Sequence, residues 1–427
     1  MGGVDGVALE TEKWISVLEE MGCKIYLLMG ETENQYRLNS FDIIFPIMSF
    51  FSQECLIEQD LAFYKPEKSP QLLLHLLEEN TKRQQKFIEG WIDQNKFDLV
   101  ILENVAALPS HISLGIAVKN VVEKVNCPFL AHDHDFPWER GERYKSIHGE
   151  TNRIIKETFP FIHKKLDHAV INEACKKYLE QTWNTESVKV PNVFDFDKKL
   201  DRRAQRSEEV RNFFNIHKKS GEFFIKDDEK LLFQVTRIVR RKKIETAIEL
   251  MDQLRDEKVK LIIAGDSMDD HEDAYKNELH QLIKKLKLEQ HVHFAASVFR
   301  RRRIFQRAAR APLSLHDAYA AATACTYFSS YEGFGNAFIE SVWAKVPIFV
   351  NNYKPVFAED IGCYPFRLVI VEDNQLTVRN VRDIIEIISD EEMQKEIGLH
   401  NYEIGKKHFS FDILRGFFLD YLKKIWK

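Results

Sequence analysis

The chain has 427 residues, 44% of them hydrophobic, and a net charge of −5. This length predicts two domains of about 200 residues each, and a mildly acidic chain gives no reason to expect a nucleic acid as partner. The six cysteines lack CxxC spacing, which argues against zinc and a disulfide scaffold and favours a cytoplasmic protein. The longest apolar run, residues 43–51, is too short to cross a bilayer.

The first half of the chain alternates helices with apolar strands. A turn containing Gly3 and Gly6 leads into an amphipathic helix over residues 7–21, and we expect the turn's amides to contact a phosphate. Such a turn normally follows a first parallel strand, and because none precedes it here we expect that strand to be absent. The alternative is that the glycines form a flexible terminus. The other expected strands are 23–29, 97–102, 127–131, 167–172 and 187–192, with helices at 70–94 and 110–125. This alternation predicts a doubly wound parallel sheet.

The second half repeats the alternation after a charged segment. Its expected strands are 231–236, 259–264, 291–294, one ending at 329, 346–350 and 368–371, and its expected helices are 244–254, 273–286, 336–345 and several from 378 onward. We therefore expect one domain over residues 1–200 and another over 229–405. Residues 201–228 would form a linker with a peripheral helix, and residues 406–427 a last helix.

The most informative stretch is Ser329–Glu340, with the sequence SSYEGFGNAFIE. Gly333, Phe334 and Gly335 form a loop before a helical pattern whose N-cap we expect to be Asn336. Loop amides and a helix N-terminus suit a diphosphate. Glu332 and Glu340 flank this loop, and because phosphate repels carboxylates, their expected partners are hydroxyls of a sugar and a ribose. The alternative is that both are solvated surface glutamates.

This motif resembles the signature of retaining glycosyltransferases of family four. The resemblance implies an α/β protein with the GT-B fold, in which two Rossmann-like doubly wound domains face each other across a cleft. In it Glu332 would hold the sugar, Glu340 the ribose, and Gly333 to Asn336 the diphosphate. It also implies small-molecule donor and acceptor partners, a nucleotide sugar as co-substrate, no tightly bound cofactor, and a last helix that returns to the first domain. A homodimer is left open.

Two further segments match the family by position. Arg237 and Lys242 follow a strand and would bind the donor diphosphate, although Lys243 stands where the family usually has glycine. Fixed cations there would stabilise the charge that develops on the leaving diphosphate. A solvated basic loop is the alternative. Gly265 and Val298 would border the nucleotide.

Histidine 134 lies just beyond the strand at 127–131, where the family has a histidine near the transferred sugar. Histidine and aspartate alternate from His132 to Asp135, and both residue types are common metal ligands, so a metal site is an alternative interpretation. Since the family generally needs no bound metal and the sequence shows no third ligand, we expect no metal site.

Within the family, residues 3–14 and 132–136 are similar to the mannosylglucosyl-3-phosphoglycerate synthases. This similarity implies GDP-mannose as donor and glucosyl-3-phosphoglycerate as an acceptor. A UDP-glucose-dependent glucosyltransferase, a catalytically inactive nucleotide-sugar-binding protein and a glycoside phosphorylase remain alternatives.

Overall fold

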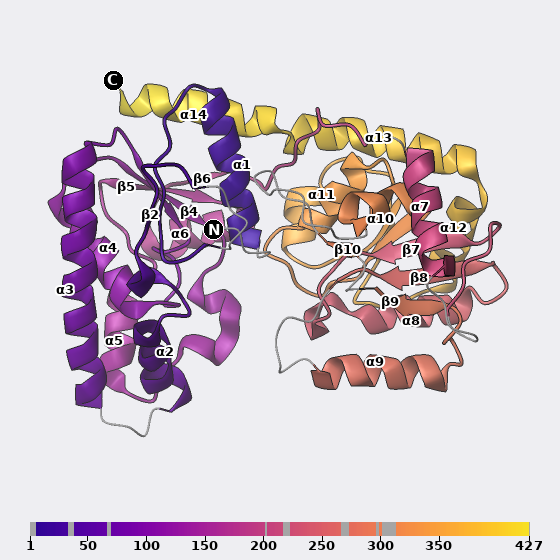
Figure 1. Ribbon diagram of the computed structural model, residues 1–427, viewed down its shortest axis with the longest axis horizontal. Helices are drawn as coiled ribbons and strands as arrows, with labels where there is room; N and C mark the ends of the chain where they lie inside the picture. The colour runs from indigo at the N-terminus through magenta and orange to yellow at the C-terminus, as the bar shows by residue number, and fades with distance from the viewer. Residues whose placement is uncertain are drawn as a thin grey trace. The chain divides into compact units, whose positions relative to one another are not determined.

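The computed structural model describes residues 6–32, 38–65, 70–200, 203–216, 223–265, 273–295, 299–300 and 313–426. The chain divides into two compact units (Figure 1). Unit 1 consists of Met1–Pro191 and Leu414–Lys427, and unit 2 is Asn192–Ile413. The chain thus enters unit 2 once and returns to unit 1 at its end.

Unit 1 contains a four-stranded parallel sheet. Its strands lie in the order β3 (Val100–Glu103), β4 (Phe129–Asp133), β5 (Leu166–Val170) and β6 (Ser187–Lys189). The strand expected over residues 23–29 shortens to β1 (Leu28–Met29), which pairs only with β2 (Ile43–Ile44). The α-helices of this unit are α1 (Gly6–Glu20), α2 (Gln53–Gln59), α3 (Pro70–Asn95), α4 (Ile112–Lys124), α5 (Gly149–Thr158), α6 (Glu173–Trp183) and most of α14 (Phe411–Ile425). The short helices are η1 (Pro46–Met48), η2 (Asp60–Tyr64) and η3 (Pro137–Tyr144).

Unit 2 contains a six-stranded parallel sheet in the order β14-β13-β12-β7-β8-β9. These strands are β7 (Lys230–Gln234), β8 (Val259–Ile263), β9 (Val292–Phe294), β12 (Ala324–Tyr327), β13 (Ile348–Asn351) and β14 (Val369–Val371). If these six strands are numbered 1 to 6 in chain order, with β7 as strand 1 and β14 as strand 6, their order across the sheet from β9 to β14 is 3-2-1-4-5-6. This is the Rossmann order. The predicted α/β class with Rossmann-like parallel sheets is therefore confirmed.

Helices connect these strands, as parallel pairing requires. The helices of unit 2 are α7 (Arg203–Ile216), which precedes the sheet, η4 (Arg240–Lys242), α8 (Ile244–Gln253), α9 (Asp273–Lys285), α10 (Leu315–Ala321), α11 (Asn336–Trp343) and η6 (Phe357–Ile361), and α12 (Val378–Ser389) and α13 (Glu391–Phe409), which follow the last strand. A separate parallel pair joins β10 (Phe299–Arg300) to β11 (Leu313–Ser314). Among the described residues, no helix is both long and apolar enough to cross a bilayer.

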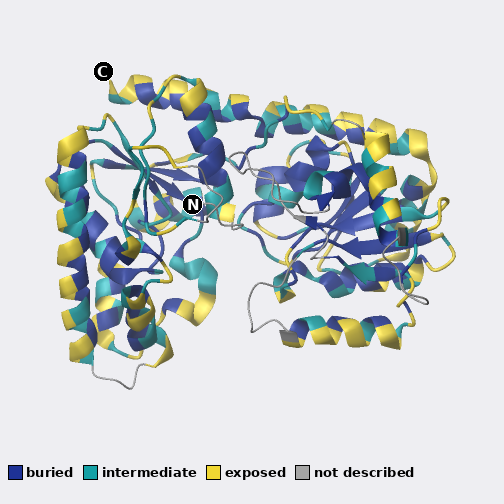
Figure 2. Cartoon of the chain, viewed as in Figure 1, coloured by how far each residue is buried: buried dark blue, intermediate teal, exposed yellow. Residues whose placement is uncertain are grey.

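Each unit has its own hydrophobic core, and the strands are the most buried elements (Figure 2). In unit 2 the side chains of Leu232, Leu261 and Ile263 are fully buried. In unit 1 Phe129 and Ala131 are equally inaccessible. Strands buried on both faces read as continuous apolar runs, which is why the sequence located them well.

Candidate functional site

The carboxyl ends of β7 and β12 define the candidate site of unit 2. These neighbouring strands continue to opposite sides of the sheet, since β7 leads to β8 and β12 to β13. At such a switch point the loops diverge, and ligands of open parallel sheets bind there. Lys242 lies in the loop after β7, and Glu332 lies in the loop after β12.

The structure brings Lys242 and Glu332 into direct contact. The Lys242 ammonium donates a short hydrogen bond to the Glu332 carboxylate, and both side chains are buried. The Arg241 guanidinium donates to Glu332 Oε2 at 2.6 Å and to the Tyr331 carbonyl at 3.0 Å. Arg237, which the sequence analysis paired with Lys242, is exposed. Arg241 is a second cation in direct contact with Glu332, and the predicted diphosphate contact of Arg237 stays a prediction.

Burial and the neighbouring charges shift the pKa values of Glu332 and Lys242. Burial opposes charge on Glu332, but the positive charges of Lys242 and Arg241 outweigh it and lower the pKa of Glu332 to about 2. Burial lowers the pKa of Lys242 to about 8, against the opposing effect of Glu332 and with further lowering by Arg241 and Arg237. Two cations face one carboxylate, so a net positive charge remains for an anion.

Lys243 ends the turn in a left-handed conformation, with φ 49° and ψ 49°. Residues with a Cβ rarely adopt this conformation, whereas glycine does so freely. This backbone conformation would suit the glycine that the family resemblance implied at this position. The backbone keeps the same turn here with lysine, and the Lys243 ammonium lies 3.3 Å from a Glu245 carboxylate oxygen.

The glycine loop leads directly into α11. Gly335 has φ 150°, and a Cβ there would lie 2.5 Å from the Tyr353 hydroxyl oxygen. Tyr353 donates this hydroxyl to the Phe334 carbonyl at 2.8 Å, which fixes the loop. The expected N-cap was wrong by one residue, because Gly335 is the N-cap and Asn336 is the first helical residue. Asn336 instead accepts a 2.8 Å hydrogen bond from the Asn192 side chain.

Glu340 lies within α11 and is buried. The Tyr319 hydroxyl donates to its carboxylate at 2.9 Å. A buried carboxylate with a hydroxyl partner is not the solvated surface glutamate of the alternative interpretation.

Of the other residues predicted to contact the nucleotide, the structure describes Gly265 and Gly6. A Cβ on Gly265 would lie 1.5 Å from the Thr236 carbonyl oxygen, so this glycine is required by the close approach of two backbones. Gly6 is the first residue of α1 and is exposed, with open space where a Cβ would stand. Gly3 and Val298 lie outside the described residues.

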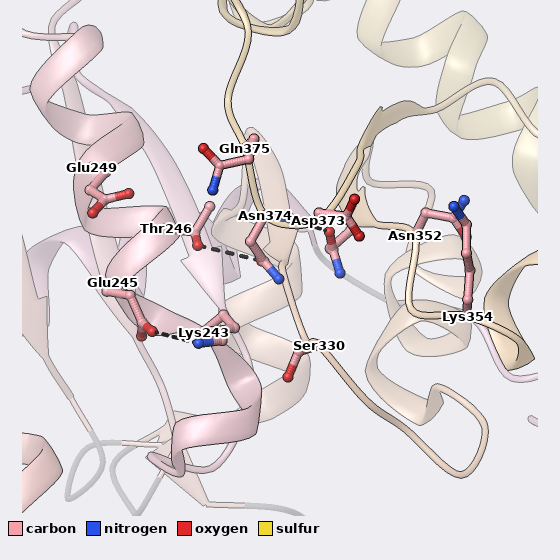
Figure 3. Close-up of a pocket in the computed structure, with 11 residues that line it drawn as sticks. Lys243, Glu245, Thr246, Glu249, Ser330, Asn352, Lys354, Asp373, Asn374 and Gln375 are labelled. Atoms are coloured by element: carbon pink, nitrogen blue, oxygen red, sulfur yellow. Dashed lines mark hydrogen bonds and ion pairs between the residues drawn. The ribbon is translucent and has the colours of Figure 1, made fainter.

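A polar pocket of about 530 Å³ borders the same loops of unit 2 (Figure 3). It is lined by Lys243, Glu245, Thr246 and Glu249 beside Ser330, and by Asn351, Asn352, Lys354, Asp373, Asn374 and Gln375. Its lining is dominated by amide, hydroxyl and carboxylate groups, which suits a hydroxylated ligand.

In unit 1 the predicted His134 belongs to a buried cluster. The register of β3 and β4 places Glu103 opposite His132. His132 Nδ1 lies 2.9 Å from Glu103 Oε2 and 3.3 Å from His134 Nε2. Glu103 was not among the predicted site residues, although a carboxylate directly after the expected apolar strand at 97–102 was a signal. The predicted contact of His134 with a transferred sugar stays a prediction.

Burial and the neighbouring charges act in opposite directions on the pKa values of Glu103 and His132. Burial raises the pKa of Glu103, but His132 and His134 outweigh it and lower that pKa to about 2. Burial also lowers the pKa of His132, although Glu103 opposes this. Asp133, the residue between the two histidines in the sequence, has Oδ2 2.7 Å from Nδ1 of the fully buried His168.

Comparison with known proteins adds a family match. Residues 215–403 match the family model described as "Glycosyl transferases group 1". A protein of Thermotoga maritima named mannosylglucosylglycerate synthase is 28% identical over 449 aligned residues, covering 97% of this chain and 95% of that protein. A protein of Petrotoga mobilis with the same name is 26% identical, covering 97% of each.

Solved structures resemble the whole chain. Anabaena Alr3699/HepE in complex with UDP and glucose has a TM-score of 0.63 at 14% identity, covering 99% of this chain and 97% of that one. The sucrose-phosphate synthase of Thermosynechococcus elongatus has a TM-score of 0.65 at 14% identity, covering 99% and 94%. At this identity the likeness concerns the fold.

Proposed function

We propose that this chain, which is a glycosyltransferase with the GT-B fold and resembles the mannosylglucosylglycerate synthases, transfers a mannosyl residue from GDP-mannose to glucosylglycerate. The names of the two relatives support an acceptor without phosphate, in place of the phosphorylated acceptor that the sequence motifs favoured. The transfer would retain the configuration of the sugar's anomeric carbon.

The observation that carries this proposal is the cluster of Lys242, Arg241 and Glu332 at the switch point of unit 2. The cluster retains a positive charge after Glu332 is counted, and the Gly333–Gly335 loop adjoins it. A lysine ammonium has three donors, so Lys242 can bind a phosphate oxygen while it still contacts Glu332. The donor diphosphate would bind here, and Glu332 and Glu340 would accept from hydroxyls of the sugar and the ribose.

The reaction breaks the bond between the anomeric carbon and the diphosphate oxygen and forms one to the acceptor oxygen. The acceptor proton passes to the leaving diphosphate, so no separate base is required. Negative charge grows on the diphosphate as the bond breaks, and the fixed cations Lys242 and Arg241 would stabilise it more than they stabilise the ground state.

The experiment combines donor binding with product analysis. Donor affinity is measured by calorimetry with GDP-mannose and, separately, UDP-glucose. We expect Glu340→Ala to weaken GDP-mannose binding about ten- to hundredfold, because a hydrogen bond to a charged group contributes about 1.5–3 kcal/mol. Tyr319→Phe is the matched control, since it removes the hydroxyl partner of Glu340 and leaves the carboxylate in place.

Product formation tests the acceptor. With GDP-mannose, nucleotide release should require glucosylglycerate, and the anomeric coupling in the product's NMR spectrum should match that of the donor. Unchanged donor affinity in Glu340→Ala contradicts the ribose assignment. A glucosylated product from UDP-glucose supports the alternative donor, and binding of a nucleotide sugar without turnover supports an inactive binding protein.

A further inference from the structure

Three side-chain atoms of unit 1 that could bind a metal ion lie within 4.8 Å of one another. They are Glu103 Oε2, His132 Nδ1 and His134 Nε2, and among the described residues this is the group of histidine, cysteine and acidic side chains close enough to share an ion. Their separations are 2.9 Å (Glu103 to His132), 3.3 Å (His132 to His134) and 3.8 Å (Glu103 to His134). From the sequence we expected no metal site, because the family generally needs no bound metal and no third ligand was visible; Glu103 now supplies a third possible ligand.

These separations fit coordination to one ion. In a tetrahedral zinc site with bonds of about 2.0–2.1 Å, two ligand atoms lie about 3.3 Å apart. The 2.9 Å distance alone is an ordinary hydrogen bond, but 3.8 Å is too long for one. The 3.3 Å side of the triangle matches the spacing of two zinc ligands, and the 2.9 Å and 3.8 Å sides lie on either side of it.

The surrounding chain holds the His132 ring and the backbone of residues 132–135 in place. The Trp14 ring stacks on the His132 ring, with centroids 3.7 Å apart. Asn104 has φ 56°, and its side-chain oxygen accepts the backbone N–H groups of His134 at 2.9 Å and Asp135 at 3.3 Å. The Asn104 N–H donates in turn to the His132 carbonyl at 2.9 Å. These contacts limit how far the two histidines can move, so less ordering is needed when an ion binds.

We propose that Glu103, His132 and His134 bind one divalent transition-metal ion, with zinc as the best match. Two imidazoles and one carboxylate form a ligand set that zinc and other first-row metals prefer over magnesium. Three protein ligands leave a coordination position for water or a substrate oxygen, as in catalytic rather than structural sites. Glu103 retains 23% of its side-chain exposure, so the ion has a path from solvent. This proposal does not depend on the identity of donor or acceptor.

The test uses the full-length protein, stripped of metal with a chelator. Zinc, cobalt(II) and magnesium are added separately, and bound metal is measured by elemental analysis after gel filtration. We expect one zinc per chain that excess magnesium does not displace. Cobalt should give the intense visible absorption bands of a tetrahedral ion with nitrogen and oxygen ligands.

The variants assign the ligands. Glu103→Gln should weaken zinc binding at least tenfold, and His134→Ala should abolish the cobalt bands, while circular dichroism shows that both proteins are folded. His75→Ala is the control for adventitious surface binding, because His75 is exposed on α3, and it should bind as the unchanged protein does.

Two results would overturn the proposal. One is the absence of stoichiometric zinc and of tetrahedral cobalt bands in the unchanged protein. This result does not depend on whether a variant folds. The other is undiminished zinc affinity in a folded Glu103→Gln or His134→Ala protein.

Discussion

At the residue scale, the balance of charge around Lys242 decides whether an anion binds to unit 2. The lysine is buried, which favours its neutral form, while Glu332 favours the charged form. The outcome is a pKa of about 8 for Lys242, so the ammonium is charged at neutral pH and loses its proton within the range where the protein can be studied.

We predict that affinity for the nucleotide sugar falls as pH rises through about 8, since the proton lost from Lys242 removes one of the cations that face the diphosphate. The loss should reach about tenfold one unit above the pKa, because only about a tenth of the lysine is then protonated. Calorimetric titrations from pH 6.5 to 9 measure it.

Lys242→Arg provides the comparison, because the guanidinium stays charged over this whole range. The variant should lose the decline in affinity above pH 8, whatever its affinity at pH 7. A decline of equal size in both proteins would assign the titrating group elsewhere.

At the element scale, β7 and β8 approach so closely at their carboxyl ends that only glycine fits at residue 265. The Ala264 N–H donates to the Gln234 carbonyl at 3.0 Å, which continues the parallel ladder up to this glycine. The segment after β7 carries the basic residues of the candidate site, so the packing at Gly265 positions functional side chains as well as stabilising the sheet.

We predict that Gly265→Ala destabilises the protein by about 1–3 kcal/mol, since its Cβ would collide with the Thr236 carbonyl and the backbones must separate. Gly90→Ala is the matched control. Gly90 lies inside α3 with open space around a Cβ, so the same substitution there should stabilise the helix by about 0.5–1 kcal/mol. Urea denaturation measures both, and equal effects would show that Gly265 tolerates a side chain.

At the scale of the whole molecule, the chain completes unit 1 with its last helix. From Leu414 onward α14 belongs to unit 1. The fully buried Phe418 meets the Trp14 ring edge-on with centroids 5.0 Å apart, and the Tyr421 hydroxyl donates to Asp167 at 3.1 Å. Unit 1 thus requires residues from both ends of the sequence.

We predict that a chain truncated after Ile413 loses the unfolding transition of unit 1, while unit 2 keeps its own transition and its donor affinity. Four buried side chains, Leu414, Phe418, Tyr421 and Leu422, leave unit 1. At about 1.5–3 kcal/mol each, their loss is comparable to the stability of a whole domain.

Scanning calorimetry with and without nucleotide sugar distinguishes the two transitions. Truncation after Ile425 is the control, because it removes only the exposed Trp426 and the terminal lysine, and both transitions should survive. Loss of the unit 2 transition along with that of unit 1 would show that unit 2 does not fold independently.

The sequence by itself determined the class of fold and the elements that carry the site. Buried parallel strands are continuous apolar runs, so they could be located without a structure. The two glycines of the Gly333–Gly335 loop and the helical pattern that follows them located the loop and α11 in the same way. Motif spacing likewise identified Lys242, Glu332 and Glu340, which prove to be buried.

Only the tertiary structure decided which side chains meet. Arg237 and Arg241 are equally basic in the sequence, and the turn at η4, which ends in the left-handed Lys243, directs Arg241 toward Glu332. Glu103 and His132 are neighbours because the register of β3 and β4 aligns them. Local patterns fix how each segment folds, but register and turn geometry depend on the packing of distant segments, so contacts between them cannot be deduced from spacing alone.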